Sequence, residues 1–398
     1  MMRFMGYPRP DGGVGARNYI AVIPAVQCGN ELADRIATEV GGTVVALTHN
    51  AACVNIPSDK QMVHRTLVGL GVNPNVAGVI VVGIGCDGPP AAPIADDITR
   101  SGKPVELITI EREGTYENAV AKGVNAARQM RADASRIERE AFDLSHLVFA
   151  SKCTGSTPAS IMACNPAVGW AADALVAAGG TFIFSETPEI IGAEHLLARR
   201  AVNEQVAARI TRMAERMENR IRATGEDIRG SQPNPGNIRG GMTTLEEKSL
   251  GAIAKSGKSP ISGVLEWGER PTGKGMYFMD GAANTPQIFL GFAAGGAQVQ
   301  SLNYGAGLPT RFHNYTCAVG GIATVPVMKL FSSPQDVSQR EYFDLYAGTI
   351  IEGSETVAEV GQRLLEELVA IASGKPAKQE MNSRYKEPLI MYYTGPIL

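Results

Sequence analysis

The sequence predicts an α/β protein built from doubly wound, mostly parallel sheets with helices on both faces and divided into two α/β domains. Apolar strand-like segments and helical segments alternate through the first 140 residues, which is the pattern of repeated βαβ units. The segment Val76–Ile84 is apolar throughout, as expected for a central parallel strand whose two faces are both buried. A chain of 398 residues is also longer than one core needs.

The first domain is expected over residues 1–141. In it, each apolar β-prone run is followed by a segment with a helical pattern. The last helical segment is rich in Ala, Glu and Arg and is long enough to carry the chain to a new layer. We expect strands at about 19–26, 43–48, 77–84 and 104–110, and helices at about 30–39, 59–70, 90–101 and 115–141.

The second domain is expected over residues 142–398 and begins with a new strand. A loop dense in Gly, Pro and Asn covers residues 225–243, and Thr244–Glu247 is a capping-box pattern that opens a helix directly after it. We expect strands at about 147–151, 181–185, 261–266, 276–279, 287–290 and 323–330, and helices at about 165–178, 192–222, 244–255 and 354–373.

Composition excludes several classes of protein. A net charge of −3 and a pI near 6.0 leave no basic footprint for nucleic acid, and no Lys/Arg run indicates a membrane surface. The longest apolar stretches are too short to span a bilayer. Six cysteines without a CxxC pair do not suggest a secreted disulfide framework, and the N-terminal residues lack the apolar core of a signal peptide. We therefore expect a soluble, cytoplasmic protein without nucleic-acid or membrane partners.

Four cysteines follow apolar, β-prone runs: Cys28, Cys53, Cys86 and Cys153. Ligands collect at the carboxyl ends of parallel strands, so four thiols at one sheet edge could form a metal or cluster site. The alternative is that each cysteine is a small hydrophobic residue in a core. His49 lies four residues before Cys53, and one helical turn there would place both side chains on one face toward a metal. Its alternative role is a loop histidine bonded to backbone.

Two further strand ends carry charged side chains. Lys152 and Cys153 enter a Thr-Gly-Ser turn that would suit a carboxylate or phosphate, although such turns also serve only for packing. Glu186 and Glu189 follow the next strand, where carboxylates can act as a base, bind a metal or simply cap a helix.

The segment from Asn234 to Lys248 presents Asn, Arg, Thr and Lys side chains that could grip a polyhydroxy acid, although a solvated linker is the alternative. Arg311 falls in a Gly-rich loop near Cys317 and could also face substrate.

Motifs throughout the chain are shared with one known family. They are Gly6-Tyr7, Arg9, Asp11-Gly12, Val14-Gly15, Arg17-Asn18, Cys28, Asn30, His49, Cys53, Asn75–Val79, Gly83–Cys86, Asn165–Gly169, Gly179–Thr181, Ser185–Glu189, Gly192–Glu194, Asn234–Asn237 and Thr243–Gly251. With these motifs the chain resembles the large catalytic region of the altronate/galactarate dehydratase family, which also includes the large subunit of sulfolactate sulfo-lyase. The resemblance extends to about residue 360, and the long motifs after residue 160 are the specific ones.

The resemblance implies an iron-dependent lyase that eliminates water from a sugar acid or related 2,3-dihydroxy acid to give a 2-keto-3-deoxy product. The iron would be Fe²⁺, with an iron–sulfur cluster left open, and it would act as a Lewis acid. The implied metal ligands are Cys28, His49, Cys53, Cys86 and Cys153. The implied catalytic residues, with the roles of base and carboxylate clamp unassigned, are Lys152, Glu186 and Lys248. The implied substrate contacts are Arg17, Asn165, Asn234, Arg239, Thr243 and Arg311.

Some positions depart from the family pattern. The run after Cys153 is Thr-Gly-Ser-Thr in place of Gly-Gly-Ser-Asp, Ala52 replaces a glycine, Asp87 replaces a glutamate, and Asn303–Gly307 replaces a Thr-Thr-Gly-Arg-Gly loop. These changes fall where substrate is expected, so the leaving group stays open between water and sulfite. The family's small N-terminal domain has no counterpart, which predicts either a separate small subunit or a protein that works without it, and we expect a homo-oligomer. A non-catalytic sugar-acid-binding subunit is the alternative from another class, whereas a hydrolase lacks a nucleophile–base pair.

Overall fold

The four-stranded parallel sheet of the N-terminal half has the order β4-β3-β5-β6. The computed structural model describes residues 2–53, 56–86, 88, 90–305, 321–334, 342–382 and 389–395. Helices α1 and α5 pack on one face of this sheet, and α2 and α3 pack on the other. The elements are β3(Tyr19–Pro24), α1(Asn30–Val40), β4(Val44–Ala46), α2(Pro57–Val72), β5(Val76–Gly83), α3(Ala91–Thr99), β6(Val105–Thr109), α4(Ile110–Glu113) and α5(Tyr116–Ala134).

The C-terminal half forms a seven-stranded parallel sheet with the order β10-β11-β9-β8-β12-β13-β14. Helices α6 and α13 cover one face, and α11 covers the other. The strands are β8(Val148–Thr154), β9(Thr181–Phe184), β10(Ile261–Leu265), β11(Gly275–Met279), β12(Val299–Tyr304), β13(Val327–Phe331) and β14(Leu345–Tyr346). The helices are α6(Asn165–Ala177), α7(Glu194–Ala198), α8(Glu204–Arg222), α9(Pro235–Arg239), α10(Leu245–Ile253), α11(Thr285–Ala294), α13(Val357–Ala372) and α14(Lys378–Asn382).

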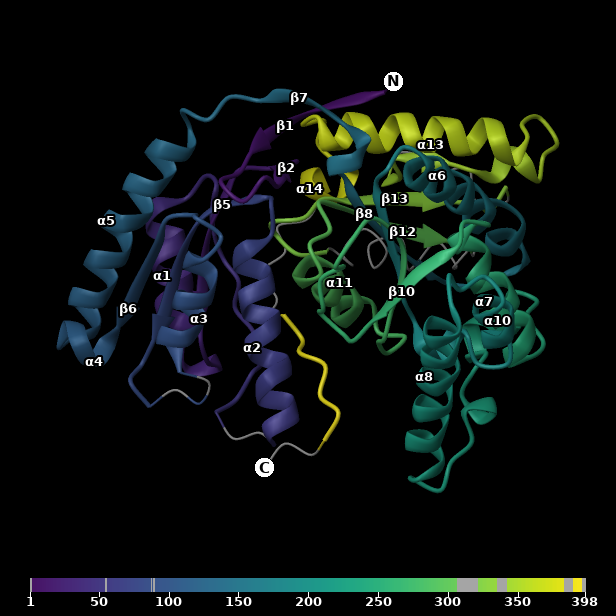
Figure 1. The fold of residues 1–398 in the computed structure, drawn as a ribbon, viewed down its shortest axis with the longest axis horizontal. Helices are drawn as coiled ribbons and strands as arrows, with labels where there is room; N and C mark the ends of the chain where they lie inside the picture. Colours follow the sequence, from purple (N-terminus) through teal and green to yellow (C-terminus); the bar gives the residue numbers. More distant parts are fainter. Residues whose placement is uncertain are drawn as a thin grey trace.

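Both halves are therefore doubly wound parallel α/β units, which confirms the predicted fold class. They lie side by side in Figure 1, with the N-terminal unit in purple and blue and the C-terminal unit in teal to yellow. A small antiparallel sheet of β2(Val14–Gly15), β1(Arg3–Pro8) and β7(Glu140–Asp143) runs along the top of both.

Three predicted elements differ from the structure. The helix predicted over 115–141 ends at Ala134, and Glu140–Asp143 form strand β7. Residues 287–290, predicted as a strand, lie inside helix α11. This helix is buried on nearly all sides, so its apolar run carries no helical periodicity, but Asn284 caps it and Pro286 stands in its first turn. The helix predicted over 192–222 is broken into α7 and α8, because Asn203 caps a new helix by accepting a hydrogen bond from the backbone N–H of Val206.

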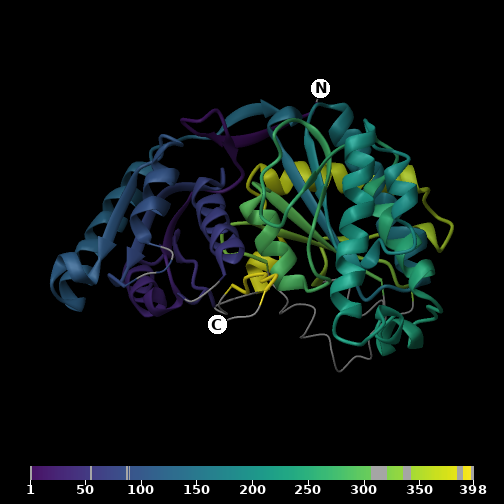
Figure 2. The ribbon, with the colours of Figure 1, turned by 60° about the horizontal axis from the view of Figure 1, so that its bottom comes forward.

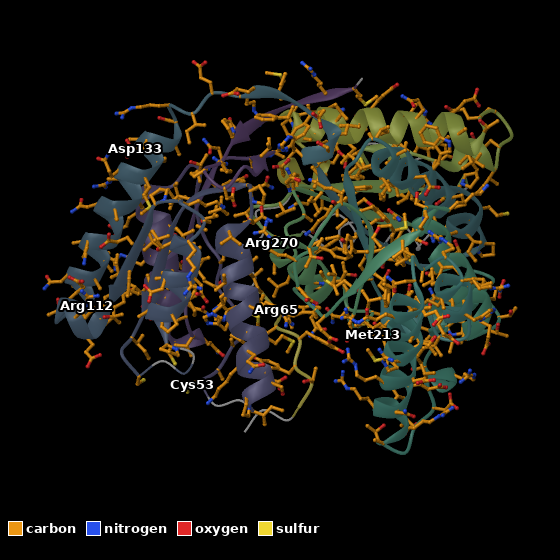
Figure 3. All side chains as sticks on the ribbon, in the orientation of Figure 1. Cys53, Arg65, Arg112, Asp133, Met213 and Arg270 are labelled. Atoms are coloured by element: carbon orange, nitrogen blue, oxygen red, sulfur yellow. The ribbon has the colours of Figure 1, made fainter. Side chains whose placement is uncertain are left out.

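The two units are joined by buried amides at the start of β5. The side chain of Asn75 donates to the carbonyls of Gln298 and Thr324, at 2.9 Å each, and accepts from the N–H of Ala16 at 2.8 Å. Arg65 on α2 also donates to the carbonyl of Trp267 at 2.6 Å, and Figure 3 shows its side chain at this junction. The relative position of the units is therefore fixed by specific bonds.

We expect Asn75→Ala to destabilise the protein, because two carbonyls and the N–H groups of Ala16 and Arg17 lose their hydrogen bonds to this side chain. The expected loss is roughly 2–5 kcal/mol, at about 1–3 kcal/mol for each unsatisfied group with partial compensation by water. Urea unfolding measures it, with exposed Asn219→Ala as the control. A loss no larger than that of the control would contradict this role.

The last described segment, 389–395, returns to the N-terminal unit and runs beside α2 (Figure 2). The N–H of Met391 donates to the side chain of Asn50 at 2.8 Å, and the Thr394 hydroxyl donates to Asp59 at 2.8 Å. Within the described part of the chain, we find no helix with the length and apolar character needed to cross a membrane.

Candidate active site

Six side chains form a buried charged cluster at the carboxyl ends of β8 and β9. Each exposes at most 5% of its surface. Strand β8 supplies two of them, the turn after β9 supplies two, and helix α10 with the 3₁₀ turn that follows it supplies two. We call these residues the buried cluster: Lys152, Cys153, Glu186, Glu189, Lys248 and Lys255.

Glu186 is the centre of the buried cluster. One carboxylate oxygen accepts from the Lys152 ammonium at 2.6 Å, and the other accepts from the Lys255 ammonium at 2.8 Å and from the backbone N–H of Cys153 at 3.1 Å. Its backbone has φ of +86°, and it is the only non-glycine residue with positive φ in the described part of the chain. Such strain persists only where surrounding contacts hold it, and it is typical of functional sites.

Charge pairing sets the protonation of this centre. Burial opposes ionisation of Glu186, but the ammonium groups of Lys152 and Lys255 outweigh it and lower the pKa to about 2. Burial likewise works against charge on Lys152, but Glu186 and Glu189 raise its pKa above the ordinary value. Burial also works against charge on Lys255, but the Glu186 carboxylate beside it raises the pKa. Glu186 is therefore a carboxylate between two ammonium ions.

The sulfur of Cys153 lies close to the same charged side chains. Its Sγ lies 3.2 Å from the Lys255 nitrogen, 3.4 Å from a Glu189 oxygen and 3.5 Å from a Glu186 oxygen. Burial, followed by the charge of Glu186, raises the pKa of this thiol to about 12. The side chain is therefore a neutral thiol that can donate to a carboxylate.

Lys248 forms the outer side of the cluster, where the 225–243 loop covers it. Its ammonium lies 3.0 Å from a Glu189 oxygen and donates to the side-chain oxygen of Gln232 at 2.5 Å. The same loop contacts the turn after β8, since the Asn237 side chain donates to the carbonyl of Ser156 at 3.0 Å. The loop is thus an ordered cover that supplies one neutral oxygen to the cluster.

The other three strand-end cysteines lie at the edge of a different sheet. Cys28, Cys53 and Cys86 come after β3, β4 and β5, which are neighbours in the N-terminal unit, and we call them the thiol edge. All three are free and exposed, and Figure 3 shows Cys53 at the rim of that unit. The expectation that four thiols share one sheet edge is therefore wrong, because the chain starts a second sheet at β8 and carries Cys153 with it.

The loops of the thiol edge touch one another. The N–H of Gln27 donates to the carbonyl of Ala51 at 2.7 Å, which ties the Cys28 turn to the Cys53 loop. A Cβ atom at Gly88 would come within 2.8 Å of the Cys53 carbonyl, so the loop after Cys86 approaches Cys53 at a position that only glycine permits.

Residues 144–395 match the family described as D-galactarate/altronate dehydratase, C-terminal, and residues 6–135 match D-galactarate dehydratase/altronate hydrolase, second domain. The chain belongs to the galactarate/altronate dehydratase family. This confirms the resemblance found in the sequence.

Three relatives illustrate the family. (2R)-Sulfolactate sulfo-lyase subunit beta of Chromohalobacter salexigens is 37% identical over 95% of this chain and 94% of that protein. Galactarate dehydratase (L-threo-forming) of Escherichia coli K12 is 34% identical over 94% of this chain and 73% of its own length. Altronate dehydratase of Bacillus subtilis is 28% identical over 99% of this chain and 78% of its own length.

Two of the predicted substrate contacts, Asn165 and Arg17, have structural hydrogen bonds instead. Asn165 donates to the carbonyl of Gly251 at 2.9 Å and accepts from Asn303 at 3.3 Å, which anchors α6 and α10 beneath the cluster. Arg17 forms a bidentate ion pair with Glu380, away from the cluster. Its Nε donates to one carboxylate oxygen at 2.8 Å and its Nη2 to the other at 2.6 Å.

The remaining predicted substrate contacts lie on or beyond the covering loop. Asn234 caps α9, and Arg239 is exposed at the end of that helix. Thr243 is exposed and bonds Glu247 through its N–H and its hydroxyl. Arg311 lies outside the described residues.

His49 has the alternative role given above, a histidine bonded to backbone. Its Nε2 donates to the carbonyl of Pro24 at 2.7 Å, and its Nδ1 accepts from the N–H of Ala51 at 3.1 Å. Residues 49–53 do not form the helical turn that would align it with Cys53. Burial lowers its pKa to about 4, so the ring is neutral and both nitrogens are occupied.

Sequence reasoning missed Lys255 and Gln232. The spacing of Lys255 could have indicated its place in the site. It lies seven residues after Lys248, and a helix continued through the 3₁₀ turn would place both on one face. No feature of the sequence could have indicated Gln232, since only the packing of the loop brings it to Lys248. Glu189 was predicted as half of a carboxylate pair with Glu186.

Proposed function

We propose that the protein is a lyase that eliminates water from a sugar acid or related 2,3-dihydroxy acid and yields a 2-keto-3-deoxy acid. The observation that carries this proposal is the Lys248–Glu189 pair, in which an ammonium and a carboxylate lie 3.0 Å apart at the outer side of the buried cluster. Elimination next to a carboxylate needs both groups, one to hold the negative charge and one to remove a proton.

Lys248 is the candidate carboxylate clamp. Gln232 now offers it a neutral oxygen at 2.5 Å, and a substrate carboxylate would accept from the same ammonium with the added strength of opposite charge. When the α-proton leaves, negative charge moves onto the substrate carboxylate, and the ammonium stabilises that enolate.

Glu189 is the better candidate for the base. Both oxygens of Glu186 accept from ammonium groups and its pKa is held at about 2, which makes it a poor proton acceptor. In the proposed reaction Glu189 takes the proton from C2 and passes it to the hydroxyl at C3, which leaves as water. The enol formed becomes the 2-keto acid when its O–H proton moves to C3. The ion pairs of Glu186 with Lys152 and Lys255 form the deeper part of the buried cluster and support Glu189 from that side.

We assign the expected iron to the thiol edge in the form of an iron–sulfur cluster, because the sulfurs of Cys28, Cys53 and Cys86 do not lie within 4.8 Å of one another as ligands of a single ion would. The thiol edge offers three exposed thiols on touching loops, and thiolates are the ligands that iron–sulfur clusters take. Iron held there would supply Lewis acidity at the thiol edge. His49 adds no free nitrogen, so we place Cys28, Cys53 and Cys86 as the ligands from this chain.

We expect Cys86→Ser to lower the iron content of anaerobically purified protein to a small fraction of the wild-type value. The same loss is expected for Cys53→Ser, whereas buried Cys164→Ser should keep its iron. Elemental analysis for iron and sulfide measures all three and separates a cluster from mononuclear iron. Unchanged iron in both exposed-cysteine variants would contradict the assignment.

Elimination of sulfite from sulfolactate is the second candidate, favoured by the 37% identity to the sulfo-lyase subunit across nearly its whole length. The chemistry differs only in the group that leaves C3. The test is to incubate iron-loaded protein with galactarate, altronate and (2R)-sulfolactate and to measure 2-keto-3-deoxy acid, pyruvate and sulfite. Turnover of sulfolactate alone would replace the first candidate, and turnover of none would favour a non-catalytic binding subunit.

A partner is part of this proposal, because that relative is named as one subunit of an enzyme. We propose that the chain acts with a small subunit and as a homo-oligomer. Native purification followed by mass measurement of the intact assembly tests both.

A further inference from the structure

Cys153, Glu186 and Glu189 form a three-donor group of the kind that binds metal ions. One potential ligand atom from each lies within 4.8 Å of the others, and among the described residues this is the only group of three or more His, Cys, Asp or Glu side chains that does so. All three are buried and belong to two adjacent strand ends. In a family expected to use iron, this geometry would ordinarily suggest an iron site.

The donors of this group are already occupied by lysine ammonium groups. Lys255 lies 2.8 Å from Glu186 and 3.2 Å from the Cys153 sulfur. Lys152 holds the other Glu186 oxygen at 2.6 Å, and Lys248 holds Glu189 at 3.0 Å. A divalent ion here would meet three buried positive charges, and repulsion at these short distances is strong where water is excluded.

We propose that the Lys255 ammonium is the resident cation of the Cys153–Glu186–Glu189 group, so that this centre works without a metal and Lys255 is a positioning residue for Glu186 and Cys153. The ammonium supplies one positive charge and several donors at the point where a metal ion would supply two charges. It thereby fixes Glu186 in its strained conformation and directs the Cys153 sulfur toward Glu189. This inference concerns the cation at the centre and does not depend on which substrate is eliminated.

The proposal predicts a gain of metal binding when Lys255 is removed. Lys255→Ala leaves a space beside a carboxylate and a thiol, with one positive charge fewer. In a Cys86→Ser background, which disables the thiol edge, we expect Lys255→Ala to bind Mn²⁺ roughly 100-fold or more tightly than the background protein. Titration with Mn²⁺, followed by electron paramagnetic resonance of the free ion, measures this.

Three controls make the result specific. Lys258→Ala removes an exposed lysine three residues further along and should gain nothing. Adding Cys153→Ser to Lys255→Ala should weaken the gained site, and Co²⁺ should lose its thiolate charge-transfer band there. Methylammonium should compete with Mn²⁺ in Lys255→Ala, because it restores the missing ammonium. If Lys255 had a purely structural role, no such competition would be expected.

Two results would overturn the proposal. One is a folded Lys255→Ala variant that gains no Mn²⁺ site. The other is metal bound at the cluster of the wild-type chain, seen as metal that survives Cys86→Ser and disappears with Cys153→Ser. The second measurement needs no lysine variant, so it decides the question even where Lys255→Ala fails to fold. Loss of lyase activity affects neither measurement, so failure of the proposed function is seen separately.

Discussion

Glu186→Gln is expected to destabilise the protein by roughly 3–5 kcal/mol, the cost typical of removing one partner from a buried ion pair. The substitution keeps the shape of the side chain but leaves the ammonium groups of Lys152 and Lys255 buried without their shared carboxylate. Lysine with fully buried charge has no access to water that could replace the lost partner. Urea unfolding followed by circular dichroism measures the loss.

A matched control is available on the surface. Glu39 pairs with Arg35 at 2.5 Å, but both side chains are more than one third exposed, so Glu39→Gln should change stability little. Combining Glu186→Gln with Lys255→Met should recover part of the loss, because it removes one of the two unpaired charges. A loss for Glu186→Gln as small as that for Glu39→Gln would contradict the description of the cluster as charged and buried.

The same carboxylate predicts a direction for the pH dependence of stability. The pKa of Glu186 is about 2 in the folded protein and near its ordinary value of 4.5 when unfolded, so the unfolded chain takes up the proton first as pH falls. The stabilisation from this group is therefore complete above about pH 4.5 and is lost as pH falls toward 2. The slope in this window should be shallower in Glu186→Gln.

How far the sequence predicts this site depends on which contacts are local. Lys152 and Cys153 end one strand and Glu186 ends the next, so the rule that ligands collect at carboxyl ends of parallel strands brings them together once β8 and β9 pair. The rule does not say which strands share a sheet. Cys153 was therefore grouped with three thiols that belong to another sheet, because strand pairing is set by packing far along the chain.

The misplaced strand at 287–290 has a related cause. A short apolar run is consistent with a buried strand and with a buried helix, and only the flanking Asn284 and Pro286 distinguish them. Gln232 is a residue whose position in the site could not be predicted from the sequence. Nothing in its sequence neighbourhood marks it, and its contact with Lys248 exists only because the loop folds over the cluster.

Lys248→Met should lower kcat/KM by roughly 100- to 1000-fold, the effect typical of removing one group that stabilises a developing oxyanion. Methionine preserves the length of the side chain and removes its charge, so the substrate carboxylate loses its clamp and the enolate loses its counter-charge. Because the interaction strengthens as the α-proton leaves, kcat should fall as well as the affinity for substrate. Steady-state kinetics on whichever acid is turned over measures both constants.

The Gln232→Ala variant distinguishes a carboxylate-binding role of Lys248 from a purely structural one. Gln232 accepts from Lys248 in the absence of substrate, and a substrate carboxylate must displace it to reach the ammonium. Its removal should leave kcat near the wild-type value and lower KM, which is the opposite of the change in Lys248→Met. A packing role for Lys248 predicts instead that both variants lose activity in proportion to lost stability. A Lys248→Met enzyme within tenfold of wild type would assign the carboxylate to another cation, and Arg239 on the same covering loop would be the next residue to replace.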